Sequence, residues 1–457
     1  MRDKLLTFLC CSGFMGVLLP SDAQSLMDVY QKALLQDHQY AAARKALEAA
    51  LEKVPQARAG FLPSVNWVAN KNHQIGEASF SSAPYITRDV RAWNWTTQIT
   101  QPVIRWSNWA AYAQADAQVV QAQEQFFLAE QELIMRTAQA YLDVQVALQS
   151  VQVARTQLHA IDEQLTLAQR MFEVGMGTIT DVHEARAKKA LNSAQRITAM
   201  NDLTAKQSEL EKIIGEFITL PPMQLIKSLP TLDPEQLDVW LDLAMHHNPQ
   251  IRIQQAALVV AEKEVTKSMA AHAPTLDVVA NRSGSYNSGM LSSPVDLAMQ
   301  TLSHQRGVQL TIPLFAGGAT QSKVRESIAL EDKAKEELTG AKRNANSQVR
   351  QAFSSVINGQ AQVEALEVAV EASQSSVESN KIGFKVGTRI NPDVLNAEQQ
   401  LYTAIRDLSK ARADAVMQSL KLKATAGALN VDDLLALESL MQPVSVAREA
   451  MQVQASR

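Results

Sequence analysis

The chain of 457 residues carries a formal net charge of −4, and 46% of its residues are hydrophobic but only 5% aromatic. This charge gives no support for nucleic-acid binding, and the low aromatic content suits long helices better than a large mixed core. Both cysteines, Cys10 and Cys11, stand near the start of the chain. The rest of the chain therefore has no disulfide framework and no thiol chemistry.

The first 23 residues have the pattern of a secretory signal peptide. A charged start precedes an apolar run from Leu5 to Leu19, and the small residues Ser21 and Ala23 follow it. We predict a signal peptide over 1–23 and an exported mature chain. A buried N-terminal helix is the alternative, and a lipid anchor on the early cysteines is not favoured. No later apolar run is long enough to span a bilayer as a helix.

The rest of the chain consists of two similar halves. The segment Leu62–Asn70 matches Ala273–Asn281 at an offset of 211 residues, and Gly175 matches Gly387 at an offset of 212. Such an internal duplication predicts that both halves are built from the same elements. We predict a first structural repeat over 24–215, a connector over 216–235, a second repeat over 236–430 and a C-terminal tail over 431–457.

Each half is expected to begin with a helix, over about 25–58 and 236–271, followed by two strands. In the first strand Val65, Trp67 and Ala69 fall on one side, and the residues between them are mostly polar. Apolar and polar residues that alternate with period two predict strands with two unlike faces. We predict strand pairs over 62–75 and 91–102, and over 274–285 and 306–315, joined by polar loops over 76–90 and 286–305.

A long helical stretch follows each strand pair. No Gly or Pro occurs from Val103 to Val174, which allows a helix of roughly 100 Å. In both halves apolar residues recur with a mean spacing of about 3.5, the coiled-coil period. These seam residues are Val144, Leu148, Val151, Ala154, Leu158, Ile161, Leu165, Ala168 and Phe172, and then Val394, Ala397, Leu401, Ala404, Leu408, Ala411 and Ala415.

Each long helix is expected to turn back at a tip, at 173–181 in the first half and 385–393 in the second. Glycine supplies the positive φ that ends the incoming helix. At the second tip Asn391 is expected to cap the returning helix, with Pro392 in its first turn. Each half is therefore predicted to carry one helical hairpin.

Four strands from one chain are too few to close a barrel, and lipid does not tolerate open sheet edges. Either the sheet is a soluble surface on a helical bundle, or several chains share one barrel of eight, twelve or sixteen strands. In a shared barrel the polar face lines the lumen and the apolar face meets lipid. The signal peptide and the tryptophans near the strands favour the shared barrel. These tryptophans are Trp67, Trp93, Trp95 and Trp106.

The sequence resembles the TolC-type outer membrane efflux and type I secretion channel family over nearly all of 25–430. The resemblance rests on the segments Phe172–Val182, Val386–Ala397 and Lys423–Asn430. It implies a mainly α fold with a small β part. Duplicated helical hairpins would form a trimeric α-barrel tunnel, topped by a shared 12-stranded transmembrane β-barrel with four strands per chain.

The same resemblance implies a location and partners. It places the chain in the outer membrane of a Gram-negative bacterium, with the helical part in the periplasm. The function it implies is the passive exit duct of a tripartite efflux or type I secretion system. The partners are a homotrimer, a periplasmic adaptor (membrane fusion) protein, an inner-membrane transporter of the ABC or proton-driven kind, and outer membrane lipid, with no nucleic acid.

The resemblance also implies a gate at the second tip. Asp393 matches a pore-facing aspartate, and threefold symmetry would bring three such carboxylates together, so that each resists ionising and attracts cations. Relatives often carry a second aspartate one turn further on, where this chain has Asn396. We therefore expect a weaker acidic ring and a weaker block by multivalent cations. A helix cap without a gating role is the alternative for Asp393.

A latch between neighbouring chains is implied in the same way. Arg389 matches a latch arginine that would bind Thr180 or Asp181 of the next chain through charge-assisted hydrogen bonds. Phe384 stands where some relatives carry a tyrosine whose hydroxyl supports the latch. We therefore expect a mouth that opens more easily. An exposed charge on a loop is the alternative for Arg389.

The two tips resemble the paired tips on which the family docks its adaptor end to end. They carry Val174-Gly175-Met176 and Val386-Gly387-Thr388. The glycines would expose backbone and let a partner helix approach closely, and a role as helix terminators alone is the alternative.

No catalytic residue, metal site or cofactor is expected. His246 and His247 have no carboxylate at ligand spacing, and no phosphate loop, nucleophile elbow or His-Glu-x-x-His motif occurs. The other functions considered are a soluble periplasmic coiled-coil adaptor or scaffold and a secreted enzyme. Drugs, metal ions and secreted proteins all stay open as the cargo.

Overall fold

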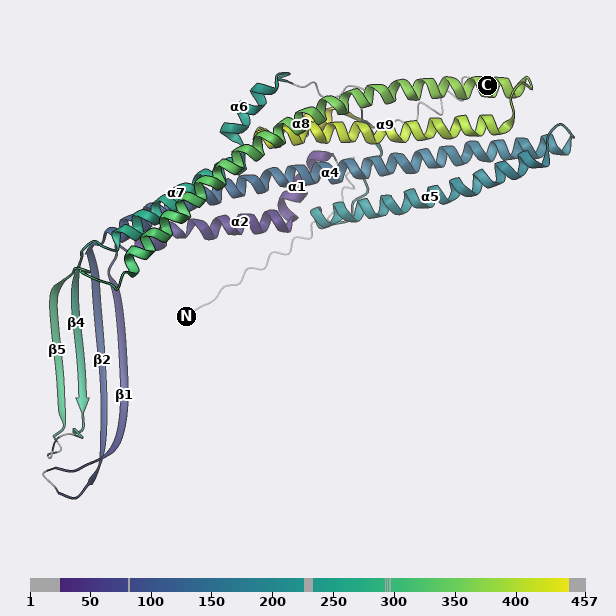
Figure 1. The fold of residues 1–457 in the computed structure, drawn as a ribbon. Coiled ribbons are helices and arrows are strands. Elements are labelled where there is room, and N and C mark those ends of the chain that lie inside the picture. The colour runs from purple at the N-terminus through teal and green to yellow at the C-terminus, as the bar shows by residue number, and fades with distance from the viewer. Residues whose placement is uncertain are drawn as a thin grey trace, which may run out of the picture.

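The computed structural model describes residues 25–80, 83–225, 233–291, 293, 295 and 297–443. The predicted signal peptide over 1–23 lies outside these residues, as does the predicted tail from 444 onward. A sheet of long strands projects from one end of an elongated helical body, and the two helical hairpins form the other end (Figure 1).

Ten helices and six strands make up the described part of the chain. The helices are α1 (Leu26–Gln36), α2 (His38–Leu51), α3 (Lys53–Ala59), α4 (Trp106–Glu173), α5 (Ile179–Ile214), α6 (Leu237–His247), α7 (Pro249–Ala270), α8 (Ala319–Lys385), α9 (Asn391–Ala426) and α10 (Asp432–Ser439). The strands are β1 (Ser64–Ala78), β2 (Ile86–Ile104), β3 (Met223–Leu225), β4 (Thr275–Asn287), β5 (Met299–Thr311) and β6 (Met441–Pro443).

The first helix of each half is broken, in contrast to the prediction of one helix over about 25–58 and one over 236–271. Each half has a break at an equivalent position, at Asp37 and at Asn248, and the first half has a further break at Glu52, between α2 and α3. Asp37 and Asn248 each cap the helix that follows, and Asn248 accepts hydrogen bonds from the backbone N–H groups of Gln250 and Ile251 at 2.9 and 3.2 Å. Side chains of this type compete with the helix for backbone groups, so they favour a new N-terminus over an unbroken helix.

Asp37 also forms a buried ion pair. Its side chain is 4% exposed, accepts a hydrogen bond from the backbone N–H of Tyr40 at 2.7 Å and binds the Arg136 guanidinium through two bonds of 3.0 and 3.1 Å. Burial alone raises the pKa of Asp37, but the hydrogen bonds from Arg136 and Tyr40 outweigh burial and hold the pKa below its usual value. The pair joins α2 to the long helix α4.

Asp37→Asn is expected to lower the free energy of unfolding by about 2 kcal/mol, because it leaves the Arg136 charge without its partner. A lowered pKa contributes stability above the unfolded-state pKa of about 4, and this contribution disappears as the pH falls through the folded-state value. The difference between wild type and variant should therefore shrink below about pH 4. Thermal unfolding of the purified protein at pH 7 and pH 3 measures this. A difference that is constant with pH would contradict the assignment.

The long helices form two hairpins. Helix α4 has 68 residues and α8 has 67, and each turns back into a helix of 36 residues, α5 or α9. Ten of the sixteen predicted seam residues are buried, whereas Phe172 next to the first tip is 44% exposed. The buried ones are Val144, Val151, Ile161, Leu165, Ala168, Val394, Ala397, Leu408, Ala411 and Ala415. No helix in the described ranges is both long enough and apolar enough to cross a membrane.

The largest core lies midway along the helical body. It joins α1, the middle of α4, the end of α5, the end of α9 and α10 around fully buried side chains such as Tyr141 and Leu142. The short strands β3 and β6 pair beside it, although their residues belong to the predicted connector and tail. Strands of three residues carry no recognisable period, so the sequence pattern did not predict this pair.

The four long strands form one antiparallel sheet in the order β1-β2-β4-β5. The central pair, β2 and β4, joins the two repeats, and β1 and β5 are the edges. Toward the loops the strands run further than predicted, so that the loops cover only 79–85 and 288–298 instead of 76–90 and 286–305. At the helix end β1 begins at Ser64 instead of 62, and β5 ends at Thr311 instead of 315. The sheet thus has two unpaired edges within the described chain.

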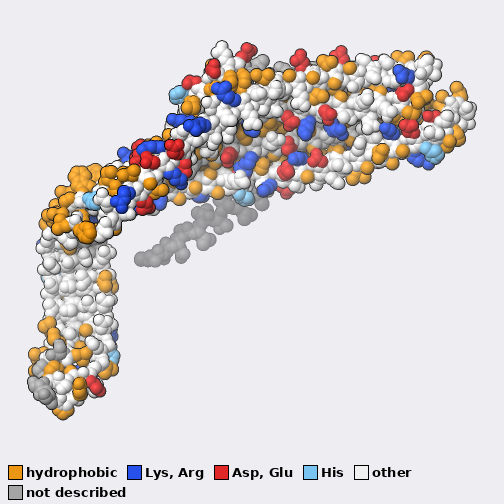
Figure 2. Space-filling view, viewed as in Figure 1, with side chains coloured by type: hydrophobic (Ala, Val, Ile, Leu, Met, Phe, Trp, Pro, Cys, Tyr) orange, Lys and Arg blue, Asp and Glu red, His pale blue; other side chains and the backbone are white. Residues whose placement is uncertain are grey.

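The sheet has two unlike faces, because residues that are opposite each other in the register share a side. We define the polar face by Asn66, Asn70, Thr96, Gln98, Asn281, Ser283, Ser303 and Gln305, and the apolar face by Val65, Trp67, Trp93, Trp95, Ile99, Val278, Ala280, Leu302, Val308 and Leu310. Figure 2 shows a sheet surface made almost entirely of uncharged polar side chains and backbone, which is the polar face. Trp106, the fourth of the tryptophans expected near the strands, is the first residue of α4 and is not part of the sheet.

Candidate functional site

The first hairpin tip ends α4 with a glycine in the left-handed region. Gly175 has φ +74°, its N–H donates to the carbonyl of Phe172 at 3.0 Å, and the N–H of Met176 donates to the carbonyl of Met171 at 2.8 Å. This pair of bonds is a Schellman motif, which satisfies carbonyls that the helix end leaves free. Nothing lies within 4 Å of a Cβ placed on Gly175, so its backbone is exposed at the end of the hairpin.

The second tip ends α8 in the same way. Gly387 has φ +77°, and its N–H donates to the backbone carbonyl of Phe384 at 3.1 Å. The N–H of Thr388 donates to the backbone carbonyl of Gly383 at 2.9 Å. A Cβ on Gly387 would also meet nothing within 4 Å. The two tips, which match in sequence, therefore also have the same backbone conformation.

The tips differ in how the returning helix starts. Thr178 and Asp181 form a capping box at the start of α5, in which the Thr178 N–H and Oγ1 both donate to Asp181 Oδ2, at 3.0 and 2.7 Å. At the second tip the expected cap by Asn391 is wrong. The cap position is Ile390, without a side-chain bond, and Asn391 is the first helical residue. The Asn391 side chain is 4% exposed and makes no hydrogen bond to the described residues. Pro392, in the first turn, is therefore the local residue that favours the start of α9 here.

Both tips present apolar side chains to solvent. Val174 is 68% exposed and Met176 is 73% exposed at the first tip, and Val386 is 68% exposed at the second. Ile179 and Ile390 beside them are also exposed. Two neighbouring apolar tips with open glycine backbones are suited to contact with another protein.

The predicted gate residues lie at the second tip. The Arg389 guanidinium lies 3.8 Å from the Asp393 carboxylate of the same chain, and both side chains are more than a third exposed. Thr180 is exposed and Asp181 is half-buried on the other hairpin, and Phe384 is half-buried under the second tip. Within one chain the structure therefore brings Arg389 to Asp393, and not to Thr180 or Asp181.

Asn396 has a partner that sequence analysis missed. The Lys188 ammonium, on α5 of the first hairpin, donates to Asn396 Oδ1 and to Gln399 Oε1, both at 3.0 Å. A lysine of the first hairpin thus binds the residue that lies one turn beyond Asp393 on α9. The contact joins residues 208 positions apart, so no local pattern signals it.

The two hairpins pack together close to the tips. Leu395 of α9 joins a cluster with Val182 and Ala185 of α5 and with residues of α4. This cluster lies next to the second tip, so a change of packing here would move Asp393 and Arg389 relative to the first tip.

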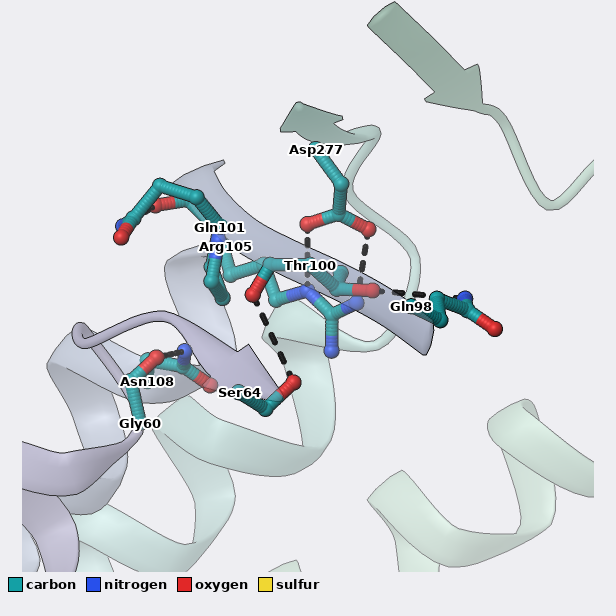
Figure 3. Close-up of polar contacts among 9 residues, drawn as sticks. Gly60, Ser64, Gln98, Thr100, Gln101, Arg105, Asn108 and Asp277 are labelled. Atoms are coloured by element: carbon teal, nitrogen blue, oxygen red, sulfur yellow. Dashed lines mark hydrogen bonds and ion pairs between the residues drawn. The ribbon is translucent and has the colours of Figure 1, made fainter. Parts of the chain in front are cut away.

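A second polar cluster lies where the sheet meets the helices (Figure 3). The Arg105 guanidinium, between β2 and α4, binds the Asp277 carboxylate of β4 through two bonds of 3.0 and 2.7 Å, and Asp277 is 6% exposed. Gln101 donates to the carbonyls of Phe61 and Pro102 at 2.9 and 2.7 Å. Asn108 donates to the carbonyl of Gly60, and Ser64 donates to that of Thr100 at 3.4 Å. The cluster fixes the strand pairs of both repeats to the start of α4.

Comparison with known proteins identifies the family. A family model described as outer membrane efflux protein matches residues 29–216 and 240–428, which closely follow the two predicted repeats. The chain belongs to the outer membrane efflux protein family. Family members include the proteases secretion protein PrtF of Dickeya chrysanthemi, 30% identical over 93% of each chain. They also include the alkaline protease secretion protein AprF of Pseudomonas aeruginosa, 31% identical over 94% of this chain and 90% of the relative.

The fold of this family member is also that of solved channels. The outer membrane protein VceC of Vibrio cholerae superposes with a TM-score of 0.71 over 89% of this chain and 97% of that chain, at 19% identity. The predicted resemblance to TolC-type channels, and the mainly helical fold with four strands per chain, are thereby confirmed.

Proposed function

We propose that the chain is the outer membrane exit duct of a tripartite efflux or type I secretion system, and that cargo passes through it without bond making or breaking. The observation that carries this proposal is the sheet, which has a polar face, an apolar face and two unpaired edges. In lipid these edges must be paired, and further copies of the chain supply the missing strands. Three copies give twelve strands, and the paired helices of three chains continue the lumen across the periplasm.

Single-channel recording tests the duct directly. Purified protein added to a planar lipid film is expected to give discrete current steps, and detergent should be needed to extract it from outer membranes. A monomer that stays in aqueous solution and gives no current would support the soluble adaptor or scaffold instead. The relatives named for protease secretion favour an exported protein as the cargo.

The gate is proposed at the second tip, with Asp393 facing the pore axis. Lys188 binds Asn396 one turn away, so its charge weakens the acidic ring that three Asp393 carboxylates would form. We expect modest block by multivalent cations in wild type and less in Asp393→Asn. The blocking concentration of a trivalent cation in planar films measures this, with Asp162→Asn as the control on α4. Identical block in wild type and Asp393→Asn would reject the gate assignment.

A latch between chains is proposed for Arg389. Both bonds from Thr178 use Asp181 Oδ2, so Oδ1 is the atom that Arg389 of a neighbouring chain would reach. Hydrogen bonds to charged groups contribute about 1.5–3 kcal/mol, so Arg389→Ala is expected to raise the open fraction at least tenfold. Open times in single-channel records give the result, with Lys385→Ala as the control. Unchanged open times would rule out the latch.

Adaptor docking is proposed at the exposed tips, on Val174-Gly175-Met176 and Val386-Gly387-Thr388. Met176→Asp should weaken binding of the adaptor at least tenfold, because it puts a charge into an apolar contact. The variant should fold normally, because the Met176 side chain is exposed and packs against little of the chain. Met176→Leu keeps an apolar side chain and is the matched control. Co-purification after cross-linking measures the effect, and equal yields from both variants would contradict docking at this tip.

A further inference from the structure

The chain turns at 288–291, directly after β4, at the end of the sheet away from the helices (Figure 1). The Ser288 N–H donates to the carbonyl of Arg91 at 2.9 Å, which extends the pairing of β4 with β2 by one residue. The side chain of Asn287 then accepts a hydrogen bond from the N–H of Gly289 at 3.3 Å. An asparagine that binds the backbone two residues further on favours a turn, so the strand ends at this point.

Two contacts place this turn over the polar face of the sheet. Gly76 of β1 and Arg88 of β2 are directly opposite each other in the register, and both positions belong to the polar face. Arg88 Nη1 donates to the carbonyl of Met290 at 3.1 Å. A Cβ placed on Gly76 would lie 3.2 Å from Leu291 Cδ1, so the Leu291 side chain lies against this strand. The segment 288–291 therefore extends from β4 across β2 to β1 on the polar side of the sheet.

The burial of side chains along β2 agrees with such a cover. Arg88 is 6% exposed, and Val90, two residues further along the same face, is 8% exposed. Asn94 and Gln98 lie on the same face nearer the helices, and both are exposed. The segment 288–291 therefore covers the polar face only near the end of the sheet.

Arg88 is suited to hold the segment in place. Besides its hydrogen bond to Met290, its guanidinium lies 5.4 Å from the centre of the Phe80 ring, in the loop between β1 and β2. Hydrogen bonds from a charged donor contribute more than those between neutral groups, and a cation beside an aromatic ring adds to them. Both loops at this end of the sheet are thus joined through one buried side chain.

We propose that the segment 288–291 narrows the external mouth of the duct and limits the size of solutes that enter the lumen from outside the cell. This inference rests on the proposed function, in which the polar face lines the lumen and the helices lie in the periplasm. The end of the sheet away from the helices is then the external end, and a segment on its polar side lies inside the lumen. Three chains place three copies of the segment around the same opening, each held by its own Arg88.

Cysteine labelling of intact cells tests the constriction. Both native cysteines lie within the predicted signal peptide, so Gln98→Cys on the polar face is the reporter thiol of the exported chain. A small charged thiosulfonate and a polyethylene glycol maleimide too large for general porins are applied from outside. We expect the large reagent to react with Gln98→Cys at least tenfold faster when Arg88→Gln or Leu291→Ser is also present. The small reagent should react at similar rates in all backgrounds.

Two controls accompany these variants. Arg91→Gln is the same change on the same strand but on the apolar face, so it should leave the reaction with the large reagent slow. Tyr85→Cys, exposed in the loop between β1 and β2, should react with both reagents in every background and shows that the protein is inserted.

The outcomes separate this inference from the duct itself. Equal rates of the large reagent with and without Arg88→Gln and Leu291→Ser would overturn the constriction, and so would an equal acceleration by Arg91→Gln. If neither reagent reaches Gln98→Cys in any background while Tyr85→Cys reacts, the polar face does not line a water-filled lumen. That result would reject the duct, and the constriction with it.

Discussion

Ile99→Lys should keep most of the protein out of the outer membrane, whereas Gln98→Lys should be inserted almost normally. The two residues are adjacent on the central strand β2 and both are exposed in the single chain. Ile99 lies on the apolar face between Val65 and Ala280, and Gln98 lies on the polar face between Asn66 and Asn281. A lysine that faces lipid costs up to about 2–4 kcal/mol per chain, and a lysine that faces a water-filled lumen costs little.

The pair of variants is matched because both introduce the same side chain into the same strand. Both variants also add one positive charge, so the difference in net charge cancels. The amount of folded protein in sucrose-gradient outer membrane fractions is the measurement. Equal amounts of the two variants would show that the apolar face does not meet lipid. A loss confined to Gln98→Lys would reverse the assignment of the two faces.

Asp277→Asn is expected to lower the free energy of unfolding by about 2 kcal/mol. The carboxylate is buried and accepts two bonds from Arg105, so the variant leaves a cation without its partner at the junction of sheet and helices. Because Arg105 is 39% exposed, water reduces the penalty below the value for a fully buried pair. Since this pair joins β4 to the start of α4, we expect the loss to loosen the sheet before the helical body.

A double-mutant cycle isolates the pair. Asp277→Asn, Arg105→Gln and the double variant are unfolded by heat in detergent, and a coupling of about 1–2 kcal/mol is expected. Asp89→Asn is the control, since its ion pairs with His73 and Arg91 are exposed and should contribute little. Strictly additive effects of the two single variants would mean that the contact adds nothing to stability.

Sequence patterns were sufficient for the sheet faces, the tips and α4, whose physical causes are local, whereas the equally local caps at Asp37 and Asn248 were missed. The alternation along Val65, Trp67 and Ala69 predicted the faces of the sheet, because successive side chains of a strand point to opposite sides. Gly175 and Gly387 predicted both tips, because a helix that ends in the left-handed region requires a residue without a Cβ. The absence of Gly and Pro from Val103 to Val174 predicted α4, since nothing there interrupts the backbone hydrogen bonds.

Tertiary structure decided the features that depend on residues distant in the chain. Lys188 and Asn396 are 208 residues apart in the chain, and Arg105 and Asp277 are 172 residues apart. No periodic sequence pattern could therefore predict these two contacts. The start of α9 at Asn391 also depends on burial, since the packing at the second tip outweighs the preference of asparagine for a cap. The sequence by itself determined the repeat, the hairpins and the two faces of the sheet, because these follow from backbone geometry and local periodicity. Which strands are neighbours, and which charges meet at the second tip and at the junction of sheet and helices, was decided only when packing brought the two halves together.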